Sequence, residues 1–168
     1  MDQVTVGDVQ EEMAAVVDAA KQREWWRTIH VRDIMTASVI CVDTATTVPD
    51  AYALMQEHKI RRLPVIDDGV LVGIVTLGDV RGALPSEVTT LNRTEQAYLM
   101  QQVKIDRVMT GDVITTTTEM TLADAARLLI QYKIGGLPVV ADDQVVGMVT
   151  ESDIFTAVVA MFDKLDQI

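Results

Sequence analysis

The chain has 168 residues and a net charge of −11, a length that suits one domain or two small domains sharing a core. With 49% hydrophobic and 23% charged residues it has the balance of a globular protein, which excludes a disordered chain. So acidic a surface repels nucleic-acid phosphates and anionic lipid. The single cysteine excludes an intrachain disulfide, and no apolar run is long enough to cross a bilayer. The N-terminus also lacks the basic and apolar parts of a signal peptide, so we expect a cytoplasmic protein that binds neither nucleic acid nor membrane.

The first predicted element is an N-terminal helical segment, residues 1–30. Its apolar residues recur at helical spacing between positions 9 and 29. The adjacent Trp25 and Trp26 lie near its end. Two neighbouring indoles cannot both face inward on one helix, so they either cap the core of this domain or meet a second subunit.

A repeat of about fifty residues dominates the rest of the sequence. Residues 31–81 align without a gap with residues 105–155 at an offset of 74, and about twenty of the 49 pairs from Asp33 to Arg81 are identical. Two copies are too few for a solenoid. We therefore expect two halves related by a pseudo-twofold axis.

Each copy has the pattern of a strand–helix–strand–strand–helix unit, which predicts the α/β (α+β) class with flanking helices. In the first copy Thr46 and Thr47 precede a helix whose apolar residues share one face, and Asp67-Asp68-Gly69 forms a turn before the last strand. The predicted strands cover 38–42, 63–67 and 70–76 in the first copy and 112–116, 137–142 and 144–150 in the second.

Two further segments complete the predicted organisation. Residues 82–104 connect the copies and are expected to end in a helix, through Ala97, Tyr98, Leu99 and Met100. The second repeat, residues 105–168, includes an extension of its last helix over 154–168.

The conserved spacing of "MT", "LPV" and "VGIVTLGD" or "VGMVTESD" in both copies resembles a tandem pair of cystathionine-β-synthase (CBS) domains, over residues 31–155. The resemblance implies two copies packed sheet against sheet, with two clefts between them. In many members of that family such clefts bind AMP, ADP, ATP, S-adenosylmethionine or related dinucleotides as regulatory ligands. The resemblance implies no catalytic cofactor and no enzymatic activity.

The Thr-x-x-Asp pairs at 76–79 and 150–153 have two interpretations, which can coexist. Such a pair at a strand-to-helix junction is close to a capping box, in which the side chains satisfy free backbone N–H groups. The same helix N-terminus suits a phosphate, and a carboxylate beside it can accept both hydroxyls of a ribose.

The resemblance places the functional residues in two unequal clefts. The primary cleft gains two guanidinium groups, which pair well with phosphate oxygens. The second has only glycines at the equivalent positions, with Arg61 left as a cation that could reach across to it. The second cleft is therefore expected to be weaker, empty or suited to a less charged adenosyl ligand. The primary cleft comprises Thr36, Cys41, Arg61, Arg62, Thr150, Ser152 and Asp153. The second comprises Thr76, Asp79, Thr110, Thr115, Gly135 and Gly136.

The sequence is compatible with a sensor or a scaffold more than with an enzyme. The leading hypothesis is a homodimeric sensor of adenosine-containing ligands that regulates an unidentified protein. The alternative is an interaction or scaffold dimer with degenerate clefts, which Gly135 and Gly136 favour. An enzyme would need a nucleophile–base pair or a metal cluster, and neither pattern occurs; His30 and His58 lack companions at metal-ligand spacing and are expected at the surface or at helix ends.

Overall fold

The computed structural model describes residues 28–83 and 101–165 and the isolated positions 10, 13, 95, 98 and 99, with side chains up to residue 163. The predicted helix over 9–29, with its two tryptophans, and most of the connecting segment lie outside these residues. Within the described ranges, no helix is both apolar enough and long enough to cross a membrane.

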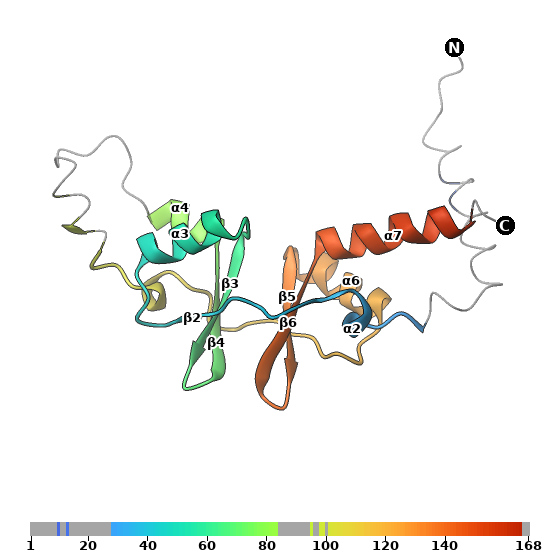
Figure 1. Ribbon diagram of the computed structural model, residues 1–168, viewed down its shortest axis with the longest axis horizontal. Coiled ribbons are helices and arrows are strands. Elements are labelled where there is room, and N and C mark those ends of the chain that lie inside the picture. Colours follow the sequence, from blue (N-terminus) through green and yellow to red (C-terminus); the bar gives the residue numbers. More distant parts are fainter. Residues whose placement is uncertain are drawn as a thin grey trace, which may run out of the picture.

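The described chain forms two α/β halves that stand side by side, each with a small sheet and helices on it (Figure 1). This is the mixed class that the repeat pattern predicts. In the first copy, as read along the sequence, the elements are α2 (Val31–Ile34), β1 (Thr36–Ala37), β2 (Val42–Asp43), α3 (Val48–Glu57), β3 (Arg62–Asp67), β4 (Val70–Thr76) and α4 (Leu77–Ala83). In the second they are η2 (Ile105–Arg107), α6 (Leu122–Tyr132), β5 (Gly136–Ala141), β6 (Gln144–Thr150) and α7 (Glu151–Leu165).

The β3–β4 and β5–β6 hairpins share one register, which establishes the pseudo-symmetry. Arg62 lies opposite Thr76 in the first, and Gly136 lies opposite Thr150 in the second, at the same offset of 74 residues. Both hairpins have a register shift at the equivalent place. The predicted turns are confirmed: the tip residues have positive φ, +82° at Gly69, where glycine carries no steric penalty.

The opening residues of each copy cross to the other copy. Strand β1 pairs antiparallel with β6, so that Thr36 lies opposite Met148. Thr110 forms the equivalent bridge to Ile74, with backbone hydrogen bonds of 2.9 Å in both directions. The methionine before each threonine packs on the same sheet: a Cβ at Gly147 would lie 2.6 Å from the sulfur of Met35. A larger residue at Gly147 would therefore displace the Met35 side chain.

The same exchange extends to the two hydrophobic cores. Val31, from the start of the first copy, is fully buried in the core of the second, and Ile105 is fully buried in the core of the first. Arg32 also forms an ion pair with Glu119 of the second copy. The packing units therefore differ from the repeats as read along the sequence, because each unit takes its opening residues from the other copy.

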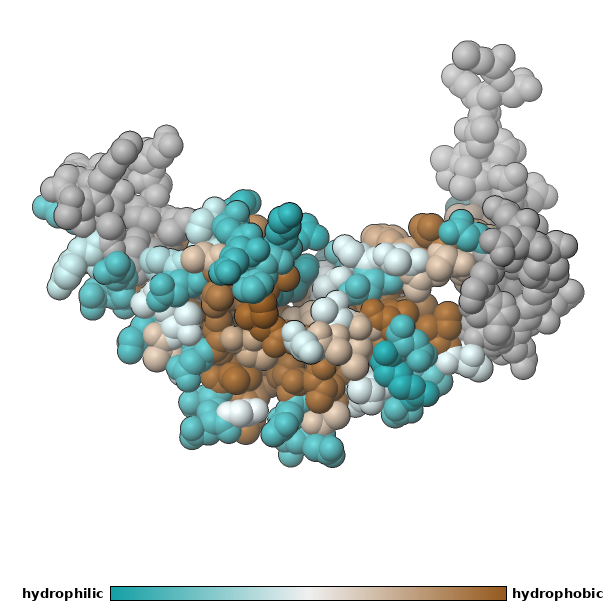
Figure 2. All heavy atoms as spheres, in the orientation of Figure 1, coloured by the Kyte–Doolittle hydropathy of each residue, from teal (hydrophilic) through white to brown (hydrophobic). Residues whose placement is uncertain are grey.

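Aliphatic residues fill both cores. Figure 2 shows apolar residues gathered in the middle of one face, where the strands of the two halves meet. The first core is Val42, Val48, Ala51, Met55, Leu63, Val65, Val75, Val80 and Ile105. The second is Val31, Ala125, Leu129, Leu137, Val139 and Val149.

The strands predicted over 38–42 and 112–116 are much shorter in the structure. The first is reduced to β2, which pairs in parallel with β3, and the second to a single bridge between Thr116 and Val139. Ser38 has a left-handed φ of +61°, which interrupts an extended strand. Residues 38–40 and 112–114, which do not pair as predicted, line the cavities between the two halves.

Candidate functional site

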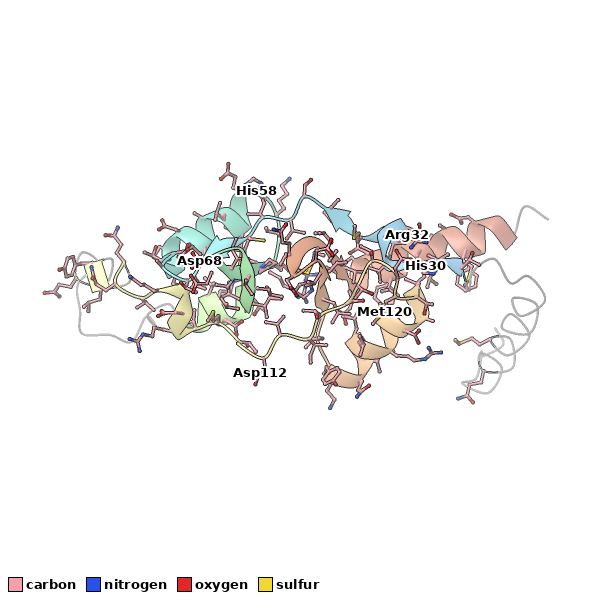
Figure 3. The ribbon with its side chains drawn as sticks, turned by 90° about the horizontal axis from the view of Figure 1, so that it is seen from below. His30, Arg32, His58, Asp68, Asp112 and Met120 are labelled. Atoms are coloured by element: carbon pink, nitrogen blue, oxygen red, sulfur yellow. The ribbon has the colours of Figure 1, made fainter. Side chains whose placement is uncertain are left out.

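The described residues enclose two cavities at the seam between the copies. The first has a volume of about 400 Å³, within the usual range for small-molecule sites, and the second about 260 Å³. Figure 3 shows His58, which lines the first cavity, and Asp112, which lines the second, on opposite edges of the molecule. The pseudo-twofold relation between the copies therefore produces one cavity on each side of the seam.

Both copies contribute to the first cavity. The first copy supplies β1 with the residues after it, and the turn from the end of α3 to the start of β3; the second supplies β6 and the first turn of α7. The lining residues are Thr36, Ser38, Val39, Ile40, His58, Lys59, Ile60, Arg61, Arg62, Met148, Thr150, Ser152 and Asp153. The structure therefore brings together six of the seven residues predicted for the primary cleft.

Thr150 and Asp153 form the predicted capping interaction. The backbone N–H of Thr150 donates to Asp153 Oδ2 at 2.8 Å, and the Thr150 hydroxyl donates to the same oxygen at 2.7 Å. Within the described chain Asp153 Oδ1 receives no hydrogen bond. The cap therefore fixes the carboxylate at the cavity wall and leaves one oxygen for a hydroxyl group of a ligand.

Four basic side chains lie at one wall of the first cavity, at positions 58, 59, 61 and 62. Arg61 and Arg62 were predicted to line it, whereas His58 and Lys59 were not. His58 is also the C-cap of α3, a helix end as expected. Their position just before the arginines could have predicted this, because successive residues in a turn after a helix end lie close together.

The second cavity has a different charge balance. Thr76, Thr110, Gly135 and Gly136 line it as predicted. Arg62 from the first copy, Lys133 and Asp112 also line it, and none of these three was assigned to it from the sequence. Asp112 stands where the first copy has Ser38, so a carboxylate replaces a hydroxyl at the equivalent position.

Asp79, Cys41 and Thr115 were predicted for the clefts but line neither of the two cavities described. Asp79 accepts hydrogen bonds from the N–H and the hydroxyl of Thr76, at 2.8 and 2.7 Å, and so makes the same cap as Asp153 without reaching the second cavity.

Cys41 and Thr115 occupy equivalent positions in the two copies. Each lies between an isoleucine that lines a cavity, Ile40 or Ile114, and a residue buried in the interior at 42 or 116. The chain turns inward at this point, which takes both side chains out of the cavities. Burial also raises the pKa of the Cys41 thiol above its ordinary value, which disfavours a reactive thiolate.

Arg62 is half-buried at the boundary of the two cavities. Burial lowers the pKa of its guanidinium below the ordinary value, the adjacent Arg61 lowers it further, and Glu151 opposes both. An arginine remains protonated in proteins, so Arg62 is a partly desolvated cation at this boundary.

The donor chemistry of the site is that of a binding cavity. Across residues 28–83 and 101–163, no group of three His, Cys, Asp or Glu side chains is placed to hold a metal ion. What the first cavity presents is hydroxyl groups, one fixed carboxylate and several cations, a set suited to sugar hydroxyls and phosphate.

Comparison with known proteins establishes the family. The family model of the CBS domain matches residues 31–86 and 105–160. The CBS domain-containing protein YhcV of Bacillus subtilis is 32% identical over 124 residues, which are 74% of this chain and 81% of YhcV. The chain therefore belongs to the CBS-domain family and carries two CBS repeats.

Two solved structures of this fold contain ligands. The CBS domain pair of protein MJ0100, in complex with 5-methylthioadenosine and S-adenosyl-L-methionine, is similar with a TM-score of 0.66 and 31% identity, covering 80% of this chain and 98% of that one. CBSX2 in complex with AMP is similar with a TM-score of 0.64 and 33% identity, covering 79% of this chain and 98% of that one.

Proposed function

We propose that this CBS pair is a regulatory module that binds an adenosine nucleotide in the first cavity and passes its occupancy to a partner protein. CBS pairs are in general regulatory modules, and those of MJ0100 and CBSX2 hold adenosine-containing ligands. The observation that carries the proposal is the first cavity itself, where the Asp153 carboxylate and the Arg61–Arg62 pair come from different copies and line the same space.

The charges favour a phosphate-bearing ligand over S-adenosylmethionine in this cavity. In a chain of net charge −11, four basic side chains gather at one wall. Phosphate oxygens pair with guanidinium and ammonium groups, whereas the sulfonium of S-adenosylmethionine is repelled by like charge. The assignment is therefore AMP, ADP or ATP with the phosphates at residues 58–62 and the ribose at Asp153.

Affinity should rise with the number of phosphates, because each added phosphate brings further negative charge to the ammonium group of Lys59 and the guanidinium groups of Arg61 and Arg62. We expect the order ATP, ADP, AMP, adenosine from tightest to weakest in isothermal titration calorimetry. A nucleotide at 100 times its dissociation constant should also raise the free energy of unfolding by about 2.7 kcal/mol. Absence of binding by all four, and by S-adenosylmethionine, would favour the scaffold alternative.

Lys59 and Lys133 provide a matched control for that series, since they are equivalent in the repeat and line different cavities. Lys59→Gln should weaken ATP about tenfold at the first cavity and leave adenosine unchanged. Lys133→Gln should leave the first cavity unaffected. Equal effects of the two substitutions would contradict the assignment of the phosphate wall.

Asp153→Asn separates the binding role of the carboxylate from its capping role. The amide oxygen of asparagine can still accept from the Thr150 N–H, so the variant should unfold within about 1 kcal/mol of the parent in urea. It should bind adenosine and ATP at least tenfold more weakly, because the charged acceptor for the ribose is gone. Asp79→Asn, at the equivalent cap outside both cavities, is the control and should leave both affinities unchanged; equal losses in the two variants would show that the cap alone matters.

The helices of the second copy carry a surface suited to a second copy of the chain. On α7 the exposed Phe155, Val159 and Phe162 recur at helical spacing, and Ile130 of α6 is exposed as well. The positions equivalent to Phe155 and Ile130 in the first copy are Arg81 and Gln56. This asymmetry favours a homodimer in which α6 and α7 meet the same helices of the partner, an isologous contact.

A charge within this surface should separate the subunits. Phe155→Asp should convert a dimer to a monomer in size-exclusion chromatography with light scattering. Arg81→Asp, at the equivalent place in the first copy, should leave the dimer intact. A dimer that survives Phe155→Asp but not Arg81→Asp would place the contact on the first copy instead.

A further inference from the structure

The side chain of Arg62 crosses from the first copy onto the glycine pair of the second. A Cβ on Gly135 would lie 2.0 Å from Arg62 Nη2, and a Cβ on Gly136 would lie 3.3 Å from Arg62 Cδ. Arg62 consequently lines both cavities, whereas its neighbour Arg61 lines the first and not the second. The glycines leave the space that the guanidinium occupies.

The repeat makes this arrangement unequal. Gly135 and Gly136 are the counterparts of Arg61 and Arg62, so the second copy has no arginine to give in return. The described wall of the second cavity contains the cations Arg62 and Lys133 and the carboxylate of Asp112. Without Arg62, the second cavity would keep one cation against one anion and would lose its attraction for phosphate.

A carboxylate stands beside the guanidinium in the position observed. Glu151 Oε2 lies 2.9 Å from the point that a Cβ of Gly135 would occupy, the same point that Arg62 Nη2 approaches. Glu151 also acts on Arg62 as an opposing charge. Its negative charge therefore favours the guanidinium in the position over Gly135.

We propose that Arg62 is shared by the two cavities, so that an anionic ligand in one withdraws the guanidinium from the other and the two sites bind phosphate with negative coupling. A planar guanidinium forms a bidentate pair of hydrogen bonds with one phosphate. It cannot form such a pair with phosphates in two separate cavities at the same time. A phosphate held by Arg61 and Arg62 in the first cavity draws Arg62 away from Gly135. Coupling of binding free energies is reciprocal, so a phosphate in the second cavity weakens the first by the same factor.

This inference rests on the proposed function, in which the first cavity holds the phosphates of a nucleotide. It adds that occupancy of the first cavity controls the second. The second cavity then binds an anionic ligand tightly only while the first is empty, and a ligand without phosphate escapes the coupling.

Gly135→Ala tests the sharing directly. The added methyl group takes the place of the Arg62 guanidinium, and the flexible end of that side chain can move without disturbing the fold. We expect ADP to bind in two phases to the parent, and the variant to bind ADP about threefold more tightly in the first cavity and at least tenfold more weakly in the second. Asp153→Asn identifies the first-cavity phase, and isothermal titration calorimetry measures both.

Gly111→Ala is the control, since a Cβ there meets no atom within 4 Å. It should leave both ADP phases unchanged. Adenosine affinity should be the same in the parent, Gly135→Ala and Gly111→Ala, because adenosine has no phosphate to compete for Arg62. ADP affinities that do not respond to Gly135→Ala, or adenosine and ADP affinities that change together, would overturn the sharing of Arg62.

One further variant and one further ligand test the sharing of Arg62 separately from nucleotide binding. Arg62→Ala should remove the second ADP phase and weaken the first, whatever the fate of the Gly135 variant. Pyrophosphate, which has the charge without the nucleoside, is titrated in parallel into the parent and Gly135→Ala. If the parent binds pyrophosphate but no nucleotide, the proposed function is contradicted. If pyrophosphate binds with equal affinity to the parent and to Gly135→Ala, the sharing of Arg62 is contradicted.

Discussion

The exchange of opening residues between the two copies is the contact on which the site depends. Thr36 pairs with β6, Thr110 bridges to β4, and Val31 and Ile105 are each buried in the core of the other copy. Full burial of such a side chain contributes about 1.5–3 kcal/mol. The seam therefore cannot open without exposing residues of both cores, and the two walls of each cavity are held at fixed distances.

The pseudo-symmetric backbone carries side chains that are not symmetric, and this difference gives the two cavities different chemistry. The hairpins keep one register at an offset of 74 residues. The equivalent side chains nevertheless differ: Arg61 and Arg62 of the first copy correspond to Gly135 and Gly136 of the second, and Ser38 corresponds to Asp112. One cavity is consequently strongly cationic. The other cavity is lined by Arg62, which comes from the first copy, so its charge depends on where the Arg62 side chain lies.

Much of this structure could be predicted from the sequence because the repeat duplicates every local signal. The helices, the hairpins and their turns follow from apolar periodicity and from the Asp-Gly and Asp-Asp tips. Six of the seven residues predicted for the primary cleft line the first cavity, because their positions follow the family motif. The role of Asp153 as a cap follows from the Thr-x-x-Asp spacing itself, and the structure confirms it.

The remainder depends on contacts between distant segments, which local patterns do not encode. The pairing of β1 with β6 joins residues more than a hundred positions apart, and two residues alone have too little periodicity to predict a strand. Cys41 and Thr115 were placed by analogy, but the inward turn of the chain removes them from the cavities. The position of Arg62 over Gly135 could not be foreseen, because a long side chain has several rotamers and the space that selects one belongs to the other copy.

In the proposed binding mode, residues of both copies hold one nucleotide together in the first cavity. A crystal structure of the protein soaked with ADP tests it most directly. We expect density in that cavity, with a ribose hydroxyl at Asp153 Oδ1 and phosphate oxygens at the guanidinium of Arg61 or Arg62. A nucleotide bound elsewhere, or held in this cavity through residues of one copy alone, would contradict it.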